Sequence, residues 1–262
     1  MRNGDAEWDE RPAPMLRLPD LQGRTAIVTG ASLGIGKATT SLLLENGARV
    51  FGISRDQGTL THPRLTRLTC DLSDMSGIEG AFRQIAERAT EIDYVVNVAG
   101  IDPKYAIDHT RVEDWDHLVN LNLRAYYFMI KLALPLLRLG QGRSIVNVSS
   151  INYRLGVPGR AAYSATKAGV LGLTTGLSRE LGRERIRVNT VSPGWVFTER
   201  QVEEYFGGVD AERHLSYLAQ QQSLMLKITS MDIANHIAFY LSNVSRASTA
   251  HNCVVDGGWI LE

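Results

Sequence analysis

Residues 25–36 read TAIVTGASLGIG, a short β-branched run followed by a stretch that contains three glycines. The run 25–29 is typical of a buried strand, and residues 35–46 have the length of a helix. Glycines between a strand and a helix let the backbone turn tightly and approach a pyrophosphate, toward which the first N–H groups of the helix point. The spacing G-x-x-x-G-x-G therefore predicts a nucleotide-binding turn, with Gly30, Ser32, Leu33, Gly34 and Gly36 as its candidate members, or otherwise a plain strand-to-helix turn.

The alternation of strand and helix continues through the rest of the chain. Further strands are expected at 49–54, 64–70, 93–99, 144–150, 186–192 and 252–256, and helix-length segments lie at 75–90, 112–139, 161–183 and 232–243. Strands that are apolar on both faces and alternate with helices form a parallel sheet covered on both sides. The sequence thus predicts an α/β fold: a single Rossmann-like, doubly wound parallel sheet of about seven strands with helices on both faces.

The domain organisation is simple. Residues 21–262 are expected to form one dinucleotide-binding and catalytic domain, because no repeat, low-complexity tract or linker divides them. Residues 1–20 are polar and contain prolines, and they are predicted to form a flexible N-terminal arm. The segment 198–230 breaks the alternation, is polar and aromatic, and suits a substrate lid.

Composition narrows the class of partner. The chain has 28 basic and 28 acidic side chains, and such a balance argues against a nucleic-acid or membrane partner. Its two cysteines, Cys70 and Cys253, lie in apolar runs and are interpreted as small core residues of a cytoplasmic protein. No leader peptide or apolar run of ~18 residues is found. No metal is expected, because the six histidines are scattered without ligand spacing.

A candidate acid/base pair begins the segment 161–183. Tyr163 and Lys167 are four residues apart, which puts them on one face of a helix, one turn from each other. A free tyrosine has a pKa near ~10, and a nearby ammonium favours the phenolate and would bring that pKa toward neutral pH. Ser150, at the end of the fifth predicted strand, has a hydroxyl that can both donate and accept a hydrogen bond.

These landmarks resemble, in kind and in order, those of the short-chain dehydrogenase/reductase family, from about Leu21 to Trp259. TGASLGIG looks like the family's nucleotide signature, Asn97-Val98-Ala99-Gly100 is similar to its N-N-A-G motif with Val98 in place of the second asparagine, and Tyr163-x-x-x-Lys167 matches its catalytic motif. The resemblance implies that the catalytic residues are Asn122, Ser150, Tyr163 and Lys167. A buried helical asparagine such as Asn122 can instead satisfy backbone groups.

The resemblance also implies further contacts to the cofactor. Asp71 and Leu72 follow the third strand, where the family holds adenine, and Lys167 would bind the nicotinamide ribose. The remaining residues that the resemblance assigns to the nucleotide are Ile35, Asn97, Ala99, Gly100, Tyr163, Pro193, Gly194, Val196 and Thr198.

The end of the second strand bears on the choice of cofactor. Ser54 and Arg55 resemble the family's phosphate-binding pattern, and a guanidinium suits the 2′-phosphate of NADP. Asp56 lies next to them and could instead accept hydrogen bonds from the ribose diol of NAD. We favour NADP over NAD.

The substrate is expected to be a small polar molecule. Pocket candidates besides Ser150 are Asn152, Arg154, Trp195 and Arg200, and either arginine could bind an acidic group or serve a solvated or subunit contact. His214 is interpreted as a solvated lid residue. The stretch SPGWVFTERQ resembles the branch of the family that oxidises sugars or sugar acids.

The sequence therefore predicts an NAD(P)-dependent oxidoreductase that acts on a sugar or a sugar acid. A 3-ketoacyl or general ketone reductase of the same family is the alternative enzyme, and a nucleotide-sensing protein without turnover is the alternative of another class. The resemblance also implies a homotetramer or homodimer built on the long helices that carry Asn122 and Tyr163, whose apolar faces could equally serve the core. Their apolar faces include Tyr126, Phe128, Leu132, Leu171 and Leu177.

Overall fold

The computed structural model of the chain describes residues 8–261 and contains one seven-stranded sheet. The strands are β1 (Thr25–Thr29), β2 (Arg49–Ser54), β3 (Leu65–Thr69), β4 (Tyr94–Asn97), β5 (Ser144–Val148), β6 (Arg187–Pro193) and β7 (Asn252–Val255). Every pairing is parallel, and the order is β3-β2-β1-β4-β5-β6-β7. The predicted fold class is confirmed, and the order reverses between β1 and β4, where such sheets bind ligands.

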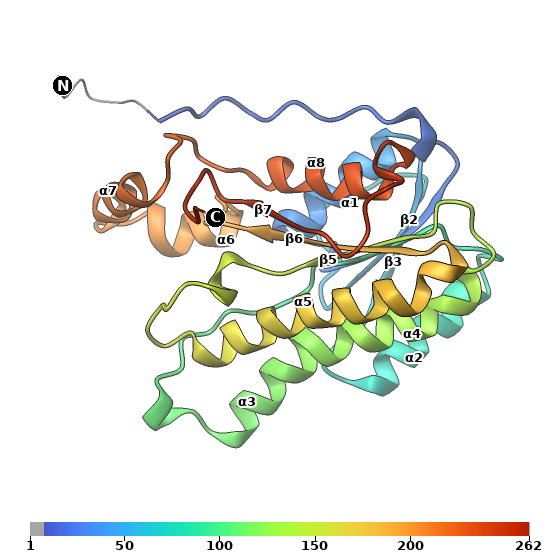
Figure 1. Ribbon diagram of the computed structural model, residues 1–262, viewed down its shortest axis with the longest axis horizontal. Coiled ribbons are helices and arrows are strands. Elements are labelled where there is room, and N and C mark those ends of the chain that lie inside the picture. Colours follow the sequence, from blue (N-terminus) through green and yellow to red (C-terminus); the bar gives the residue numbers. More distant parts are fainter. Residues whose placement is uncertain (1–7, 262) are drawn as a thin grey trace.

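Helices cover both faces of the sheet (Figure 1). One face carries α1 (Gly34–Glu45) and α8 (Ser230–Leu241), and the other carries α2 (Met75–Ala86), α4 (Ala125–Leu137) and α5 (Ala161–Leu181). The alternation of side chains along a strand explains this arrangement. In β1, Ala26 and Val28 pack with the α1–α8 layer, whereas Ile27 packs with the opposite layer.

The segment expected at 112–139 is helical but not uniform. It consists of α3 (Val112–Val119), a π-helical turn η3 (Asn120–Arg124) and α4. A π-turn inserts an extra residue into a helix and is frequent at functional sites. Asn122 lies in this turn, so the irregularity sets the direction of a predicted catalytic side chain.

The predicted lid contains three short helical pieces. These are α6 (Glu199–Gln201), the π-helical turn η6 (Val202–Phe206) and α7 (Ala211–Gln221). They lie at the carboxyl end of the sheet (Figure 1). The remaining elements are short 3-10 turns, namely η1 (Pro19–Leu21), η2 (Ile107–His109), η4 (Ile151–Tyr153), η5 (Gly182–Glu184) and η7 (Asn243–Ser245).

The described part of the N-terminal arm lies along its own chain, over α8 (Figure 1). The Leu16 amide donates to Asn235 of α8 at 2.9 Å, and the Leu18 amide donates to Asn46 at 2.7 Å. Asp9 exchanges backbone hydrogen bonds with Met225 and Lys227, near the C-terminal end of the predicted lid. Residues 1–7 lie outside the described residues, and the mobility of the arm in solution stays a prediction.

The apolar residues expected at a subunit contact divide into two groups. Tyr126 and Leu177 are buried in the core of this chain, and the Tyr126 hydroxyl donates to the Val148 carbonyl at 3.2 Å. Phe128, Leu132 and Leu171 are half-buried. Tyr126 and Leu177 are therefore core residues and cannot form a free apolar face.

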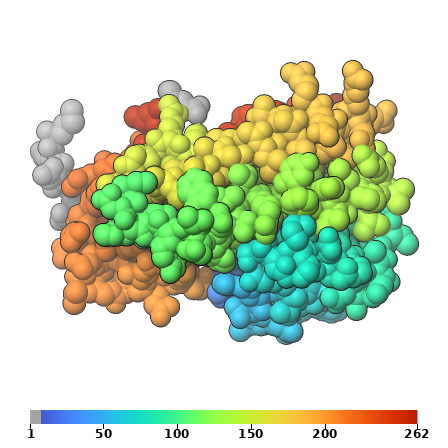
Figure 2. All heavy atoms as spheres, turned by 90° about the horizontal axis from the view of Figure 1, so that it is seen from below, coloured from blue at the N-terminus to red at the C-terminus, as the bar shows by residue number. Residues whose placement is uncertain are grey.

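The helical face seen in Figure 2 places α3 and α4 (green) between α2 (cyan) and α5 (yellow). Within residues 8–261, no helix combines the length and the apolar character needed to cross a bilayer.

Candidate active site

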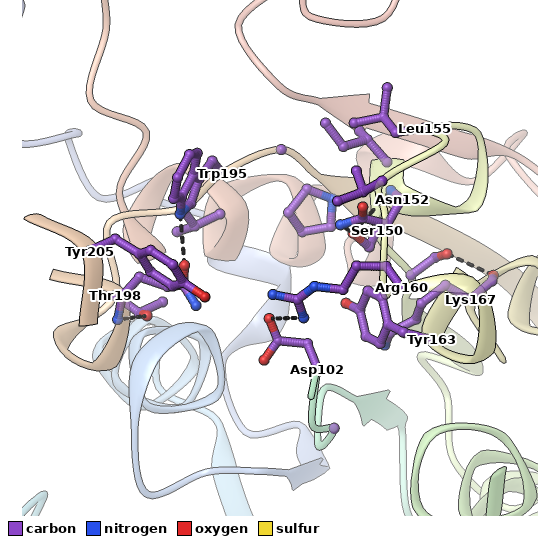
Figure 3. Close-up of a pocket in the computed structure, with 18 of the residues that line it drawn as sticks. Asp102, Ser150, Asn152, Leu155, Arg160, Tyr163, Lys167, Trp195, Thr198 and Tyr205 are labelled. Carbon is purple, nitrogen blue, oxygen red and sulfur yellow. Dashed lines mark hydrogen bonds and ion pairs between the residues drawn. The ribbon is translucent and has the colours of Figure 1, made fainter. Parts of the chain in front are cut away.

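A cleft of about 510 Å³ lies beyond the carboxyl ends of β4, β5 and β6. Its walls come from the loop after β4, the turn after β5, the start of α5, and the segment from Pro193 to the lid (Figure 3). Predicted site residues that line it are Ile35, Gly100, Ser150, Asn152, Tyr163, Lys167, Pro193, Gly194, Trp195, Val196, Thr198 and Arg200. Chain segments far apart in sequence therefore meet in one cavity.

The glycine turn between β1 and α1 is fixed by its backbone. Gly30 and Gly34 have φ of +68° and +52°, values that other residues rarely adopt. A Cβ on Gly36 would lie 2.0 Å from the Gly30 carbonyl oxygen, so a side chain there does not fit. The turn thus keeps the amide groups that begin α1 open, which is the cradle that a diphosphate requires.

An anionic group already lies at the start of α1. The carboxylate of Glu199 accepts hydrogen bonds from the Gly34 amide at 3.2 Å and from Lys37 Nζ at 3.4 Å. Hydrogen bonds, first from its own backbone and then from Lys37 and Gly34, lower the pKa of Glu199. This end of the helix therefore accepts negative charge, as the fit of a dinucleotide demands.

The region expected to hold the adenosine is open. No helix joins β2 to β3, Arg55 is exposed, and the Ser54 hydroxyl donates to the Asp56 carbonyl at 2.6 Å. Asp71 accepts hydrogen bonds from the backbone and hydroxyl of Ser73, at 2.8 and 2.7 Å, and these bonds lower its pKa more than nearby Arg55 does. Leu72 is buried.

The side chain of Asn97 joins two neighbouring strands. It is fully buried and donates to Asn147 of β5 at 2.9 Å, and it does not line the cavity. The Thr29 hydroxyl accepts from the amides of Val98 and Ala99, at 2.9 and 3.2 Å. Val98 and Gly100 of this motif line the cavity, and the cofactor contact of Asn97 stays a prediction.

Tyr163 and Lys167 lie on one face of α5, as their spacing predicts. Lys167 Nζ is 5.7 Å from the centre of the Tyr163 ring and donates to the Val148 carbonyl at 3.0 Å. Ser150 ends the segment after β5, and its oxygen accepts from the Asn152 amide at 3.2 Å. Tyr163 and Ser150 face the cavity together, and Lys167 lies behind the tyrosine (Figure 3).

Asn122 is buried in the π-turn beside this group. Its side chain accepts from the Ile101 amide at 3.0 Å and donates to the Ile101 carbonyl at 2.8 Å. These bonds fit the structural reading, in which the asparagine satisfies backbone groups. The Asn122 oxygen is also close to Gly100. A Cβ built on Gly100 would lie 3.1 Å from this oxygen, and Lys167 Nζ lies near the same point. The catalytic role of Asn122 stays a prediction.

The expected effect of Lys167 on the tyrosine is not found in this structure. Burial raises the pKa of Tyr163 to about 12, and the hydrogen bond with Ser150 and the nearby Arg160 and Arg200 only partly oppose it. Burial also lowers the pKa of Lys167 to about 8. The correction has a physical reason: both groups are desolvated, and the ammonium donates to a backbone carbonyl rather than to the phenol.

Aromatic rings build the lid side of the cavity. Trp195 lies 5.4 Å from Tyr205 and 5.9 Å from His214, measured between ring centres, and its Nε1 donates to Gln201 at 2.7 Å. The Thr198 hydroxyl caps α6 by accepting from the Gln201 amide at 3.3 Å. His214 is half-buried in this cluster and lines the cavity, so its interpretation as a solvated residue was wrong.

The cavity also holds residues that sequence reasoning missed. Arg154 is exposed and is not among the lining residues, whereas Arg160, at the N-terminal end of α5, is buried and lines the cavity. Asp102 reaches the same wall from the loop after β4. No local pattern marks these two residues, because their pairing depends on loops that only the folded chain brings together.

In residues 8–261, no group of three or more His, Cys, Asp or Glu is placed to hold a metal ion.

Residues 30–260 match a family model described as enoyl-(acyl carrier protein) reductase. The chain is 31% identical to a protein named probable galactose dehydrogenase from Rhizobium meliloti, over 94% of this chain and 98% of that protein. It is 30% identical to D-xylose 1-dehydrogenase from Caulobacter vibrioides, over 92% and 97% of the two chains. Reductases of 3-oxoacyl-[acyl-carrier-protein], such as that of Vibrio harveyi at 34% identity over 69% of this chain and 76% of that protein, match as well.

Solved structures give the same picture. Ligand-free aldohexose dehydrogenase from Thermoplasma acidophilum superposes with a TM-score of 0.86 at 26% identity, over 92% of this chain and 96% of that one. A 4-hydroxyisoleucine dehydrogenase complexed with NADH superposes with a TM-score of 0.83 at 30% identity, over 90% and 98%. The likeness extends over nearly the whole described chain.

Proposed function

Because the chain belongs to the short-chain dehydrogenase/reductase family, we propose that it oxidises a hydroxyl-bearing carbon of a sugar or sugar acid, or reduces the matching carbonyl. It is an oxidoreductase that acts on CH–OH groups with a nicotinamide dinucleotide. One observation carries the proposal. Tyr163 and Ser150 face a single cavity, with Lys167 behind the tyrosine and polar and aromatic groups on the opposite wall.

The proton chemistry belongs to this chain's own residues. In oxidation, the phenolate form of Tyr163 takes the hydroxyl proton while the Ser150 hydroxyl donates to the substrate oxygen as negative charge develops. Lys167 lies 5.7 Å from the ring and is protonated below a pKa of about 8, so it holds positive charge behind the phenol. Bound nicotinamide dinucleotide supplies the carbon that accepts or donates hydride, and its oxidised ring adds positive charge.

The residues that would hold the dinucleotide follow the edge of the sheet. The amides at the start of α1 suit the diphosphate, and Asp71 with Leu72 suits the adenine. On the other side, the backbone of Pro193, Gly194 and Val196, with Thr198, lines the cavity and would bind the carboxamide. These assignments are supported by the glycine turn, which excludes a side chain, and by the Gly34 amide, which donates to the Glu199 carboxylate and would donate to a diphosphate in its place.

We propose NADP as the preferred form. Arg55 is exposed at the end of β2, where a guanidinium can bind a 2′-phosphate. Arg55→Asp is expected to reverse or reduce the preference for NADP over NAD, measured as the ratio of the two kcat/KM values. Asp56→Asn is the matched control, since it should leave or increase that preference. An unchanged ratio in Arg55→Asp would remove the argument for the phosphate.

The lining of the cavity supports a sugar over an acyl chain. Its lining includes Asn152, Arg200 and the Trp195–Tyr205–His214 cluster, and such mixed polar and aromatic walls suit a polyol. The family description and the 3-oxoacyl reductases among the relatives favour a second candidate, the reduction of a 3-oxoacyl thioester. Acetoacetyl-coenzyme A therefore belongs in the same assay.

The decisive experiment is a screen of aldoses, sugar acids and acetoacetyl-coenzyme A with both nucleotides, read from the absorbance of the reduced nicotinamide. Tyr163→Phe should lower turnover by about 10²–10⁴-fold and leave nucleotide affinity nearly unchanged, because only the proton-transfer group is lost. Tyr127→Phe, on the exposed surface of α4, is the control. Full turnover in Tyr163→Phe would contradict the assignment, and nucleotide binding without turnover would support a sensing protein.

We also propose a homotetramer or homodimer in the cytoplasm. Val112, Trp115 and Tyr127 on α3 and α4 are 71%, 43% and 46% exposed, which leaves apolar surface for a second copy. Both cysteines are free, as suits a reducing compartment. Sedimentation velocity tests the assembly, and a monomer at micromolar concentration would contradict it.

A further inference from the structure

One wall of the cavity carries a cluster of two arginines and one aspartate. Asp102 forms an ion pair with Arg160 at 2.8 Å, and it also pairs with Arg200 from the lid. Arg160 points from the start of α5 toward Asp102, with Tyr163 beside it (Figure 3). Two guanidinium groups thus share one carboxylate next to the proposed acid/base.

The arginine of this cluster is already paired, whereas a polar atom across the cavity is not. The Arg160 side chain is only 10% exposed, and its Nη1 lies 2.8 Å from a carboxylate oxygen of Asp102. The side-chain oxygen of Asn152, across the cavity beside Ser150, is buried without a hydrogen-bond partner. Because buried polar groups are normally satisfied, this oxygen is available to accept a hydrogen bond from a hydroxyl of a bound ligand.

The cavity has an excess of positive charge, although the chain as a whole is neutral. The whole sequence has a formal net charge of zero. The charged residues lining the cavity are Lys104, Arg160, Lys167, Arg200 and Arg213, all basic, against Asp102 as the single carboxylate. A cleft with this excess attracts anions, and a guanidinium binds a carboxylate through paired hydrogen bonds.

We propose that Arg160, with Arg200, binds the carboxylate of a sugar acid, and that the oxidised hydroxyl belongs to the same molecule. The Arg160 guanidinium carbon lies 5.9 Å from the centre of the Tyr163 ring, so the anionic group and the reacting carbon are a few bonds apart. Asp102 holds the two guanidinium groups in place and lowers their combined charge. This inference rests on the proposed function and names the substrate class of that site.

The test compares sugars that differ in one group. D-galactose with D-galacturonate, and D-glucose with D-glucuronate, differ only by a hydroxymethyl group against a carboxylate. The wild-type enzyme is expected to have a kcat/KM at least about tenfold higher for the acid of one pair. Arg160→Met should lower kcat/KM for that acid by about 100-fold more than for the neutral sugar, whose loss reflects only the charge that Arg160 places beside Tyr163.

A second variant separates binding from a purely structural role. Asp102→Asn leaves two guanidinium groups without their carboxylate, so it should increase the preference for the acid. If the cluster only braced the lid, both variants would weaken acid and neutral sugar alike, and the proposal would be overturned. Arg179→Met, in the exposed last turn of the same helix, removes the same charge far from the cavity and is the control.

Failure of this inference differs from failure of the proposed function. Turnover of neutral sugars without preference for the acid, unaffected by Arg160→Met, would overturn the carboxylate site alone. No turnover of any sugar would overturn the function as well. Nucleotide affinity and melting temperature of each variant show whether it is folded, and a folded Arg160→Met enzyme that keeps the preference contradicts the proposal.

Discussion

The two halves of the cleft are built from different parts of the chain. The nucleotide half, at the carboxyl ends of β1 to β4, is made largely of backbone: a glycine turn and the open amides of α1. The substrate half, at the start of α5 and the lid, is made of side chains such as Arg160, Asp102 and Trp195. A site made of backbone requires particular residues, such as glycine, at fixed positions, and it can therefore be recognised in the sequence. A site made of side chains can use many residues, provided that the fold brings them together.

The largest effect in this comparison is expected when a side chain is added to the glycine turn. Gly36→Ala places a Cβ where the Gly30 carbonyl oxygen is 2.0 Å away, so the turn must open. We expect nucleotide affinity to fall by about 100-fold, close to 3 kcal/mol, as measured by calorimetric titration. Gly80→Ala in α2, where the nearest atom is the mobile end of Arg83 at 3.6 Å, should leave affinity unchanged. Equal effects of the two substitutions would show that the turn has no special requirement for glycine.

A smaller effect is expected where the two halves meet, at Lys167. Its folded pKa of about 8 lies below the ordinary 10.5, so between these values the unfolded chain binds more protons. Stability of the wild type therefore rises with pH across this window and is reduced below it. Lys167→Met should be more stable at neutral pH, by up to about 3 kcal/mol, while losing turnover.

Thermal unfolding as a function of pH checks this prediction. The difference in melting temperature between Lys167→Met and the wild type should shrink as pH rises from about 8 to 10.5, because the wild-type lysine becomes neutral. Lys131→Met, on the exposed surface of α4, should show no such dependence. A Lys167→Met protein that is less stable at every pH would mean that the ammonium stabilises the fold.

The smallest effect is expected at Glu199, where the lid contacts the nucleotide half of the cleft. Glu199 places a carboxylate on the Gly34 amide and on Lys37, at the position that a diphosphate needs. Glu199→Gln should therefore tighten nucleotide binding by about twofold to fivefold, the usual size of a helix-terminus charge effect. Glu203→Gln, exposed in the same lid, is the control for net charge. Weaker binding in Glu199→Gln would instead make the carboxylate a support for the turn.

Much of the fold could be predicted from local sequence. Strand and helix ranges agree closely with the structure, because β-branched runs and helix-length segments alternate clearly along the chain. The glycine turn and the Tyr163–Lys167 pair were also located correctly, since each depends on residues that are neighbours in sequence. What the spacing could not predict was the pKa of Tyr163, which depends on how deeply the whole fold buries the phenol.

The sequence by itself determined the parallel sheet, the position of the glycine turn and the spacing of tyrosine and lysine, because these follow from backbone sterics and helical periodicity. Only the tertiary structure decided that Arg160, and not Arg154, faces the cavity, that Asn97 joins two strands, and that Glu199 reaches the start of α1. Those contacts connect loops separated by many residues, and their geometry is set by how layers and loops pack, which no local pattern encodes.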